Sequence, residues 1–369
     1  MKVESLIYIY GAICLSMIGF NIVYSLILRR REPHTKKKCE KFLEKINEQI
    51  GFIRSGGTVD DEHLTFIERK MKRVNNLIAF DRVLEQLRND ASDDAFSKYL
   101  MQIRPAIMYL AVINYKRESM QTAYFSFFLT RYITNRHMDI DSIQDILLDY
   151  IKKDSLYCSV NALQALYTFG NTEHIISALK LQDLNKTFLH QKILTEGLLS
   201  FTGDHGELIR LLWQEFESFS EHMQLAIMNY IRFKADGYQK EMFDIMQDIS
   251  RGKELRLAAI RYFGKYYYEP ALEPLLAFAS DRDEANWEYA NVSIASLMKY
   301  KGFKVMEALK QALHSSNWYI RQSAAVCLEA HGVDYSSMMD VIAGNDRFAR
   351  EMITYRLESQ RLQKSGDKQ

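Results

Sequence analysis

The residue types that most often carry catalysis or bind metals are present, but their spacing predicts no reaction. The 9 histidines are scattered, and no two stand at the i, i+3 or i, i+4 spacing that puts two ligands on one helix face. The cysteines form no C-x-x-C pair and lie far apart, which predicts neither a zinc site nor a disulfide framework: Cys14, Cys39, Cys158 and Cys327. We therefore expect no metal and no cofactor.

The sequence also lacks the short motifs of phosphate binding and of a serine nucleophile: G-x-x-x-x-G-K-[ST], G-x-G-x-x-G and G-x-S-x-G. The densest polar cluster is Asp204-His205-Gly206-Glu207, which we interpret as a turn whose acidic residue caps the next helix. A Ser–His–Asp or Cys–His arrangement that forms only in space stays open at this point. The catalytic residues of an enzyme are therefore not predicted.

The composition indicates what kind of elements hold these side chains. Only 16 Gly and 4 Pro occur among 369 residues, about half the usual share, while 47% of residues are hydrophobic. These numbers argue against a turn-rich β-sandwich and against long disorder, and they favour an all-α protein. The net charge of +1 argues against a general nucleic-acid-binding protein.

The first thirty residues predict a membrane anchor. Leu6 to Leu28 contain no charged residue, and a helix of that length would be roughly 34 Å long, enough to cross the hydrocarbon core. A cleaved signal peptide is the alternative, but only Lys2 precedes the apolar stretch and the basic cluster follows it. Because basic residues stay on the cytoplasmic side, we expect a single-pass protein of the cell membrane with its short N-terminus outside and the rest cytoplasmic.

The segment after the apolar stretch is strongly basic. Residues 29–45 carry a net charge of +5, which leaves −4 on the rest of the chain. This charge serves as a topology signal, and it could also contact anionic lipid, to which each basic residue contributes about 1 kcal/mol. The candidate lipid contacts are Arg29, Arg30, Arg31, Lys36, Lys37 and Lys38. A short amphipathic helix at 39–50 should follow and be broken by the glycines of residues 51–57.

Beyond residue 120 the chain repeats itself. Apolar residues recur every 31 to 34 positions, at Leu166, Leu198, Ile231, Phe263, Leu297 and Leu328. Each is followed by a glycine that we expect to cap a helix in the left-handed conformation. These glycines are Gly170, Gly203, Gly237, Gly264, Gly302 and Gly332. A second amphipathic segment follows each time. Such helix pairs bury their apolar faces only by stacking, so the pattern predicts an α-solenoid of antiparallel pairs.

The predicted organisation has five parts. They are a transmembrane anchor (1–28), a basic juxtamembrane segment and linker (29–57), a helical N-terminal cap region (58–119), the repeat solenoid (120–345) and a C-terminal helix with a polar tail (346–369).

Two stretches carry a resemblance to a known family. Residues 255–260 (LRLAAI) and 320–325 (IRQSAA) resemble the aliphatic-Arg-then-small pattern of HEAT-like repeats of short period. The resemblance implies that Arg256 and Arg321 pack along the seam between repeats. The middle repeats lack the arginine, and another α-solenoid, such as a tetratricopeptide array, is the alternative. The repeat resemblance covers roughly residues 155–344. The short N-terminal tail and single span resemble those of bacterial membrane-anchored HEAT-repeat proteins, which implies work beside a membrane enzyme complex, for example one making or exporting envelope polysaccharide.

The remaining candidates for function are aromatic residues. They lie in one turn between paired helices and at the start of two repeats: Tyr266, Tyr267, Tyr268, Trp287, Tyr289, Trp318 and Tyr319. We expect a non-enzymatic scaffold that binds a cytosolic protein, or the cytosolic part of a membrane protein, at the inner face of the membrane. A HEAT-like lyase or hydrolase with a groove between repeats is the alternative, and shifted pKa values gathered in that groove would favour it.

Overall fold

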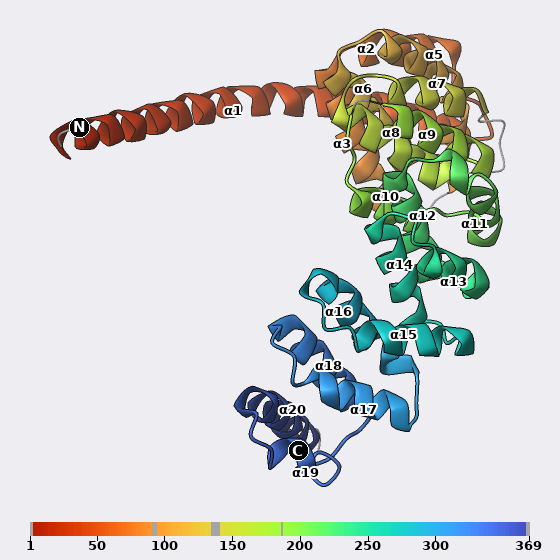
Figure 1. Cartoon of the computed structure of the whole chain (residues 1–369). Coiled ribbons are helices and arrows are strands. Elements are labelled where there is room, and N and C mark those ends of the chain that lie inside the picture. Colours follow the sequence, from red (N-terminus) through yellow and green to blue (C-terminus); the bar gives the residue numbers. More distant parts are fainter. Residues whose placement is uncertain (1–2, 91–93, 134–140, 186, 367–369) are drawn as a thin grey trace. The chain divides into compact units, whose positions relative to one another are not determined.

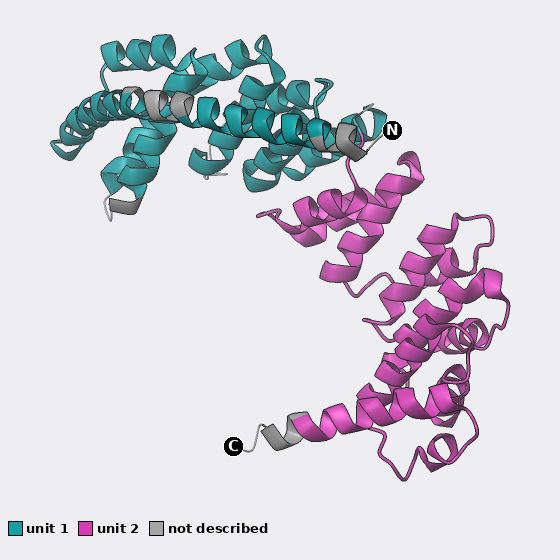
Figure 2. Ribbon diagram, turned by 90° about the vertical axis from the view of Figure 1, so that its left-hand side faces the viewer, with its two compact units in different colours: residues 1–187 teal, residues 188–369 magenta. Residues whose placement is uncertain are grey.

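The chain is helical throughout the part that the structure describes. The computed structural model describes residues 3–90, 94–133, 141–185 and 187–366, and these residues form α-helices and short 3-10 helices with no strand among them. The prediction of an all-α protein is confirmed. Contacts divide the chain into two compact units, Met1–Thr187 and Phe188–Gln369, each of which is described by itself below (Figure 2).

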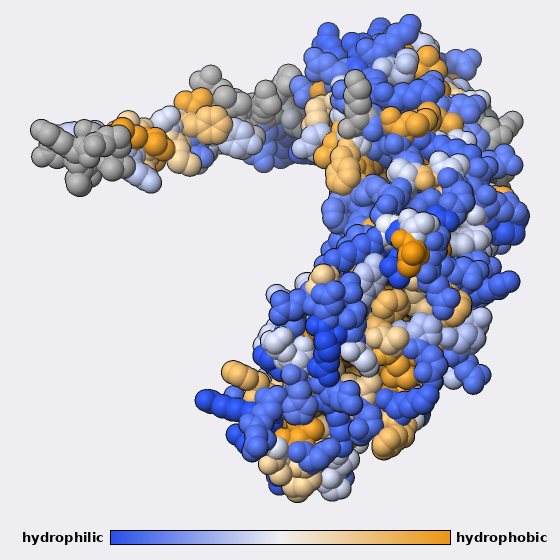
Figure 3. All heavy atoms as spheres, in the orientation of Figure 1, coloured by the Kyte–Doolittle hydropathy of each residue, from blue (hydrophilic) through white to orange (hydrophobic). Residues whose placement is uncertain are grey.

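Unit 1 begins with a long helix, α1 (Val3–Arg54), whose N-terminal part projects from the rest of that unit (Figure 1). Its segment Tyr8–Ser25 has a mean hydropathy of 1.4 and is fully exposed, so it is long and apolar enough to cross a membrane; a signal sequence would meet the same conditions. Apolar residues line this projecting part in Figure 3. The C-terminal part of α1 packs on α3 and α4 and buries Phe42, Ile46 and Ile53.

The predicted separate helix at 39–50 and the break from Gly51 onward are wrong, because α1 continues through Gly51 to Arg54. A glycine inside a helix costs about 1 kcal/mol. Burial of Ile50 and Ile53 just before and after it contributes about 1.5–3 kcal/mol each, which offsets that cost. The helix ends at Arg54, and in the turn that follows Gly56 has a left-handed φ of 88°, which directs the Gly57 amide to the Phe52 carbonyl oxygen, 2.9 Å away.

In the described residues, the rest of unit 1 contains eight helices: α2 (Asp61–Met71), α3 (Val74–Asp90), α4 (Asp94–Gln102), α5 (Arg104–Tyr115), α6 (Ser119–Tyr132), α7 (Asp141–Ile151), α8 (Leu156–Phe169) and α9 (Thr172–Leu184). Pro105 stands in the first turn of α5, where a missing amide hydrogen costs nothing, and it marks the boundary after α4. Helix α6 packs on α8 and α7 packs on α9, so neighbouring pairs stack.

Unit 2 continues the pairing. Its first helices are α10 (Gln191–Leu199), α12 (Glu221–Lys234), α14 (Lys253–Phe263), α16 (Trp287–Ser296), α18 (Trp318–Ala330) and α20 (Arg347–Gly366). Its second helices are α11 (His205–Gln214), α13 (Gln239–Gln247), α15 (Leu272–Ala279), α17 (Phe303–Ala312) and α19 (Met339–Ile342), with 3-10 turns at η1 (Phe216–Ser218), η2 (Glu269–Ala271), η3 (Glu284–Asn286) and η4 (Leu297–Lys299).

The stacking of unit 2 follows the predicted period. Each first helix packs on the next first helix, and α13, α15, α17 and α19 each pack on the first helix that follows them (Figure 1). The six apolar residues that mark the repeat are all 0% exposed. This arrangement of paired helices against their neighbours is compatible with an α-solenoid.

The glycines act differently from the expectation. Only Gly302 (φ 132°) and Gly332 (φ 75°) among the six repeat glycines have a positive φ. Gly264 instead permits close packing, since a Cβ there would lie 3.2 Å from the Ser296 Cα of the next first helix. Gly170 is similar, because a Cβ there would lie 2.5 Å from the Leu166 carbonyl oxygen. A left-handed cap is therefore wrong as the general reason for this spacing.

Buried polar groups connect successive repeats. The hydroxyl of Tyr262 donates to the Ala235 carbonyl at 3.1 Å, and the hydroxyl of Tyr300 donates to the Tyr268 carbonyl at 3.1 Å, so each ties a first helix to the turn of the repeat before it. Ser296 Oγ donates to the Ile260 carbonyl at 2.9 Å. Burial raises the pKa of both tyrosines to about 12.

Arg256 and Arg321 also lie at these seams. The Nε of Arg256 donates to the Met246 carbonyl at 3.0 Å, and its guanidinium lies 5.0 Å from the ring centre of Tyr289 in the next first helix. Arg321 donates to the Ser315 carbonyl at 2.6 Å and lies 5.2 Å from the Phe348 ring. Both arginines therefore connect the preceding turn to the following repeat.

Candidate protein-binding site

The tyrosine run lies in the turn after α14, and its three rings have different surroundings. Tyr266 contacts Tyr262, with ring centres 4.8 Å apart, and Tyr268 stacks on Phe263. Tyr267 is 56% exposed, although one side of its ring faces Tyr300 at 5.0 Å. Two of the three candidates are thus largely used in packing within the unit.

The aromatic residues at the starts of α16 and α18 do come together. Trp287 stacks on Tyr319 with ring centres 5.5 Å apart and an interplanar angle of 29°, and Tyr319 meets Trp318 edge-on at 5.2 Å. Trp318 and Tyr319 are 50% and 56% exposed, whereas Tyr289 is buried beneath Arg256. We call Trp287, Trp318 and Tyr319 the aromatic edge; Tyr289 does not belong to it.

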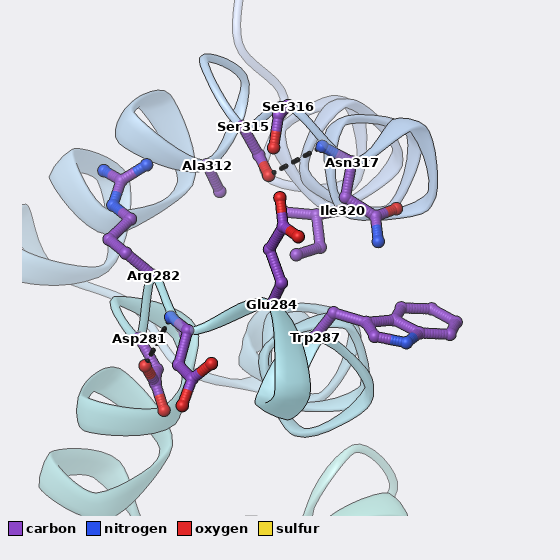
Figure 4. A pocket seen from close by; sticks show the side chains of 11 residues that line it. Asp281, Arg282, Glu284, Trp287, Ala312, Ser315, Ser316, Asn317 and Ile320 are labelled. Atoms are coloured by element: carbon purple, nitrogen blue, oxygen red, sulfur yellow. Dashed lines mark hydrogen bonds between the residues drawn. The ribbon is translucent and has the colours of Figure 1, made fainter.

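A cavity of about 590 Å³ adjoins the aromatic edge, between the turn before α16 and the turn before α18 (Figure 4). Its floor is apolar and buried, formed by Ala279, Ala312 and Ile320. Its rim is polar and carries three carboxylates and one guanidinium: Asp281, Asp283, Glu284 and Arg282. The cavity therefore combines a surface for methylene groups with a net negative opening.

Local hydrogen bonds fix both walls. On one side Asp281 Oδ1 accepts from the Asp283 amide at 2.9 Å, and Asp283 Oδ1 accepts from the Ala285 amide at 3.0 Å. On the other side the Asn317 amide donates to Ser315 Oγ at 3.2 Å, and Arg321 holds the same turn through its carbonyl groups. Both walls are turns held by their own side chains.

Glu284 is the rim residue that is available to a ligand. Its side chain points across the cavity toward the Ser315–Asn317 turn (Figure 4). No described residue forms a hydrogen bond or ion pair with its carboxylate. A cationic group entering over the apolar floor would meet this carboxylate first and would have Trp287 along one side.

The densest polar cluster of unit 1 is used in packing. The carboxylate of Asp81, which is 5% exposed, accepts from Tyr124 at 2.7 Å, from Tyr132 at 2.8 Å and from Arg131 at 3.1 Å. Arg131 also pairs with Glu85. Burial, followed by the bond to Asp81, raises the pKa of both tyrosines well above the usual range. Every group of this cluster has a protein partner that joins α3 to α6.

Two histidines fit structural roles as well. His63 is buried, and its Nε2 lies 2.9 Å from the Tyr99 hydroxyl; burial lowers its pKa to about 4. The cluster at residues 204–207 is the predicted cap, because Asp204 accepts from the amides of Gly206 and Glu207 at the start of α11. His205 Nδ1 lies 2.6 Å from the Tyr230 hydroxyl. Among the described residues no group of His, Cys, Asp and Glu is placed to hold a metal ion.

The candidate lipid contacts lie within α1. Lys36 and Lys37 are exposed and Lys38 is half-buried, while the side chains of Arg29, Arg30 and Arg31 lie outside the part that is described. The predicted linker is helical up to Arg54, so the basic residues follow the apolar segment on one helix.

The acidic rim was not predicted from the sequence. A signal existed, since Asp281, Asp283 and Glu284 crowd into the turn directly before Trp287. The sequence did not show that the next repeat, through its Ser315–Asn317 turn, supplies the opposite wall of the cavity.

No protein-family model matches the chain, and no curated protein is significantly similar to it. The class that the fold defines is therefore an all-helical protein of paired helices packed on their neighbours, with one N-terminal helix apolar enough to span a membrane.

Proposed function

We propose that this protein is a non-enzymatic scaffold, anchored in the cell membrane by residues 6–28, that binds a partner protein through the aromatic edge and the adjoining acidic cavity. The observation that carries the proposal is the unpaired carboxylate of Glu284 above a buried apolar floor and beside exposed aromatic rings. This chemistry fits a lysine or arginine side chain of the partner, whose methylenes need apolar contact and whose charge needs a carboxylate.

The proposed fold family is the short-period HEAT-like repeat. The seam contacts of Arg256 and Arg321 support it, because both arginines hold the preceding turn and pack on an aromatic ring of the following repeat. The same role recurs one repeat earlier without an arginine: Gln224, four residues after the cap Ser220, donates to the Phe216 carbonyl at 3.0 Å. This repeat therefore keeps the contact with a different donor, whereas the repeat of α16 has Ala290, without a donor, at the equivalent position.

The proposed orientation places the N-terminus outside and the helical units in the cytoplasm, because the basic residues follow the apolar segment. N-terminal sequencing of the membrane-extracted protein tests the anchor. A protein that begins at Met1 supports it, and one that begins downstream of Ser25 refutes it. Protease treatment of right-side-out and inverted vesicles tests the orientation, since only inverted vesicles should release the units.

Tethering has a direct consequence for binding. A partner that is confined to the same membrane is held at a raised effective concentration, so weak contacts at the cavity suffice. Replacement of Lys36, Lys37 and Lys38 by glutamine separates this role from lipid contact. If membrane retention and partner binding persist, these three lysines contribute nothing to either role beyond a topology signal.

Site-specific photo-crosslinking in intact membranes tests the binding site. A photoreactive amino acid at Trp318 should yield one defined product, whereas the same amino acid at Phe303, which is 80% exposed on α17, should not. Charge reversal by Glu284→Lys should abolish the product. Identical products from both positions, or a product that survives the charge reversal, would refute the proposed site.

A further inference from the structure

A second pocket in unit 2 differs in chemistry from the acidic cavity. It has a volume of about 420 Å³ and lies over α12, α14 and α16, which pack side by side as successive first helices. Three of its lining residues are cationic and none is acidic: Arg232, Arg261 and Lys265. It is therefore a concave, positively charged site, although the chain outside residues 29–45 carries a net charge of −4.

The positive charge in this pocket is not neutralised within the protein. No described carboxylate forms an ion pair with Arg232, Arg261 or Lys265. Arg232 is half-buried, and its pKa is lowered first by burial and then by the charge of Arg261. Two guanidinium groups close enough to repel each other, in a partly desolvated place, are destabilising for the unit by themselves.

The remaining contacts hold the cations in position. Lys265 donates to the Phe233 carbonyl at 2.9 Å and lies 5.9 Å from the Phe233 ring centre, while the Arg232 guanidinium lies 4.9 Å from that ring. Phe233 is 49% exposed and forms an apolar wall of the pocket. Arg232 and Lys265 are thus oriented by the Phe233 ring and the helix end, and the guanidinium N–H groups are available to a ligand.

One neutral group completes the set of donors. Asn291 lines the pocket, and its Oδ1 accepts a hydrogen bond from Ser323 Oγ at 2.7 Å. That bond fixes the amide so that its Nδ2, a donor, is the group left for other partners. The pocket therefore offers two guanidinium groups, an ammonium and an amide. The hydroxyl of Ser296, which also lines the pocket, is already bonded to the Ile260 carbonyl.

We propose that the pocket formed by Arg232, Arg261, Lys265 and Asn291 binds a phosphate monoester. A phosphate dianion presents three acceptor oxygens and nearly two negative charges at neutral pH, which suits two guanidinium forks and an ammonium. A carboxylate has fewer acceptors and less charge. The exposed Phe233 wall favours a phosphate carried by an organic group over the free inorganic ion.

The concave shape favours a soluble phosphate or a phosphorylated side chain over a membrane surface. Of the large hydrophobic side chains around the pocket, Phe233 is the exposed one, so the surface lacks the group of apolar side chains that enters a lipid interface. This site is separate from the acidic cavity, and its test does not depend on the proposed scaffold function.

Calorimetric titration of the full chain in a neutral detergent tests the proposal. The probes are phenyl phosphate, a phosphoserine peptide and, as a matched monoanion, phenyl sulfate. We expect saturable binding of at least one phosphate, and binding of phenyl sulfate weaker by about tenfold. The tighter of the two phosphates identifies the source, a small molecule or a protein side chain. Equal binding of sulfate and phosphate, or no saturable binding of either phosphate, overturns the proposal.

Variants localise the binding. Arg261→Gln and Lys265→Gln should each weaken it by about tenfold or more, and Arg261→Lys should restore it only in part, because one guanidinium fork is lost. Lys234→Gln is the control, since Lys234 is exposed on α12 and does not line the pocket. Circular dichroism verifies the fold of each variant. A loss of affinity in Lys234→Gln as large as in Arg261→Gln would overturn the assignment to this pocket.

A membrane ligand is tested separately. Lysine acetylation of the full chain is compared in nanodiscs of phosphatidylcholine with and without phosphatidic acid. The proposal expects Lys265 to be protected by the soluble phosphates and to react equally in both kinds of nanodisc. Protection of Lys265 by phosphatidic acid alone, without binding of the soluble phosphates, would overturn the proposal and assign the pocket to lipid.

Discussion

Removal of the Asp81 carboxylate should destabilise unit 1 more than any loss of an exposed ion pair. Asp81→Ala leaves Arg131, whose side chain is 19% exposed, with Glu85 as its remaining carboxylate partner, and it leaves the Tyr124 hydroxyl without its acceptor. The Tyr132 hydroxyl loses the carboxylate but keeps the backbone carbonyl of residue 81, 2.8 Å away. Breaking a buried charge pair costs about 3–5 kcal/mol. Because Glu85 is retained, we expect a cost at the lower end of this range, which lowers the free energy of unfolding by about 3 kcal/mol.

Hydrogen exchange measured by mass spectrometry on the full chain in detergent resolves this effect by location. A loss of about 3 kcal/mol corresponds to roughly a hundredfold faster exchange through unfolding in the peptides of α3 and α6. Peptides of α14 and α18, which belong to the other compact unit, provide the internal reference. Asp81→Asn keeps an acceptor and loses the charge, so its effect should lie between those of the wild type and Asp81→Ala.

The matched control is Asp149→Ala in the same unit. Asp149 pairs with Lys152 one turn away, and both side chains are about half exposed, so its loss should cost less than about 1 kcal/mol. If Asp149→Ala accelerates exchange as much as Asp81→Ala does, burial is not what gives the Asp81 cluster its energetic weight, and the reasoning is refuted.

Three further predictions concern buried groups in the two units. The folded pKa of His63, about 4, lies below its ordinary 6.5, so the unfolded chain takes up the proton first as pH drops. The free energy of unfolding should therefore fall by ~3 kcal/mol between pH 6.5 and about pH 4. Chemical denaturation of the wild type and of His63→Gln at a series of pH values should show different slopes of this free energy against pH only in that window. Gly170→Ala should lower the denaturation midpoint by the equivalent of about 1–3 kcal/mol because its Cβ meets backbone, whereas Gly237→Ala, with open space around its Cα, should not. Cys158 and Cys327 are both 0% exposed, so neither should react with a maleimide until the protein is denatured.

The repeat architecture could be predicted because it depends on a local pattern that recurs. Apolar residues such as Leu198 and Phe263 return at a fixed interval, and each is at the same depth in the core. The continuity of α1 could not be predicted, because Gly51 signals a break locally while the neighbouring helices that bury Ile53 are encoded elsewhere in the chain. At this position the burial of Ile53 stabilises the helix more than Gly51 destabilises it.

The candidate sites were predicted only in part for a similar reason. Trp287 and Trp318 were predicted from their places at the start of two repeats, and Tyr319 contacts both of their rings. Arg232 and Arg261 gave no such signal, because they occupy different positions in consecutive repeats and meet only when α12 and α14 pack. A pocket that draws its residues from several repeats leaves no motif in the sequence.

Helix α16 connects the two sites and also explains their opposite charges. Trp287 at its N-terminus borders the acidic cavity, and Ser296 at its C-terminus borders the basic pocket. The helix dipole favours acidic groups at the first end and basic groups at the second, which offsets part of the repulsion within each cluster. Ten residues of helix are about 15 Å long, which exceeds the Debye length of about 8 Å at physiological ionic strength. Salt therefore screens the two ends of α16 from each other, and a charge change in one site serves as the control for the other.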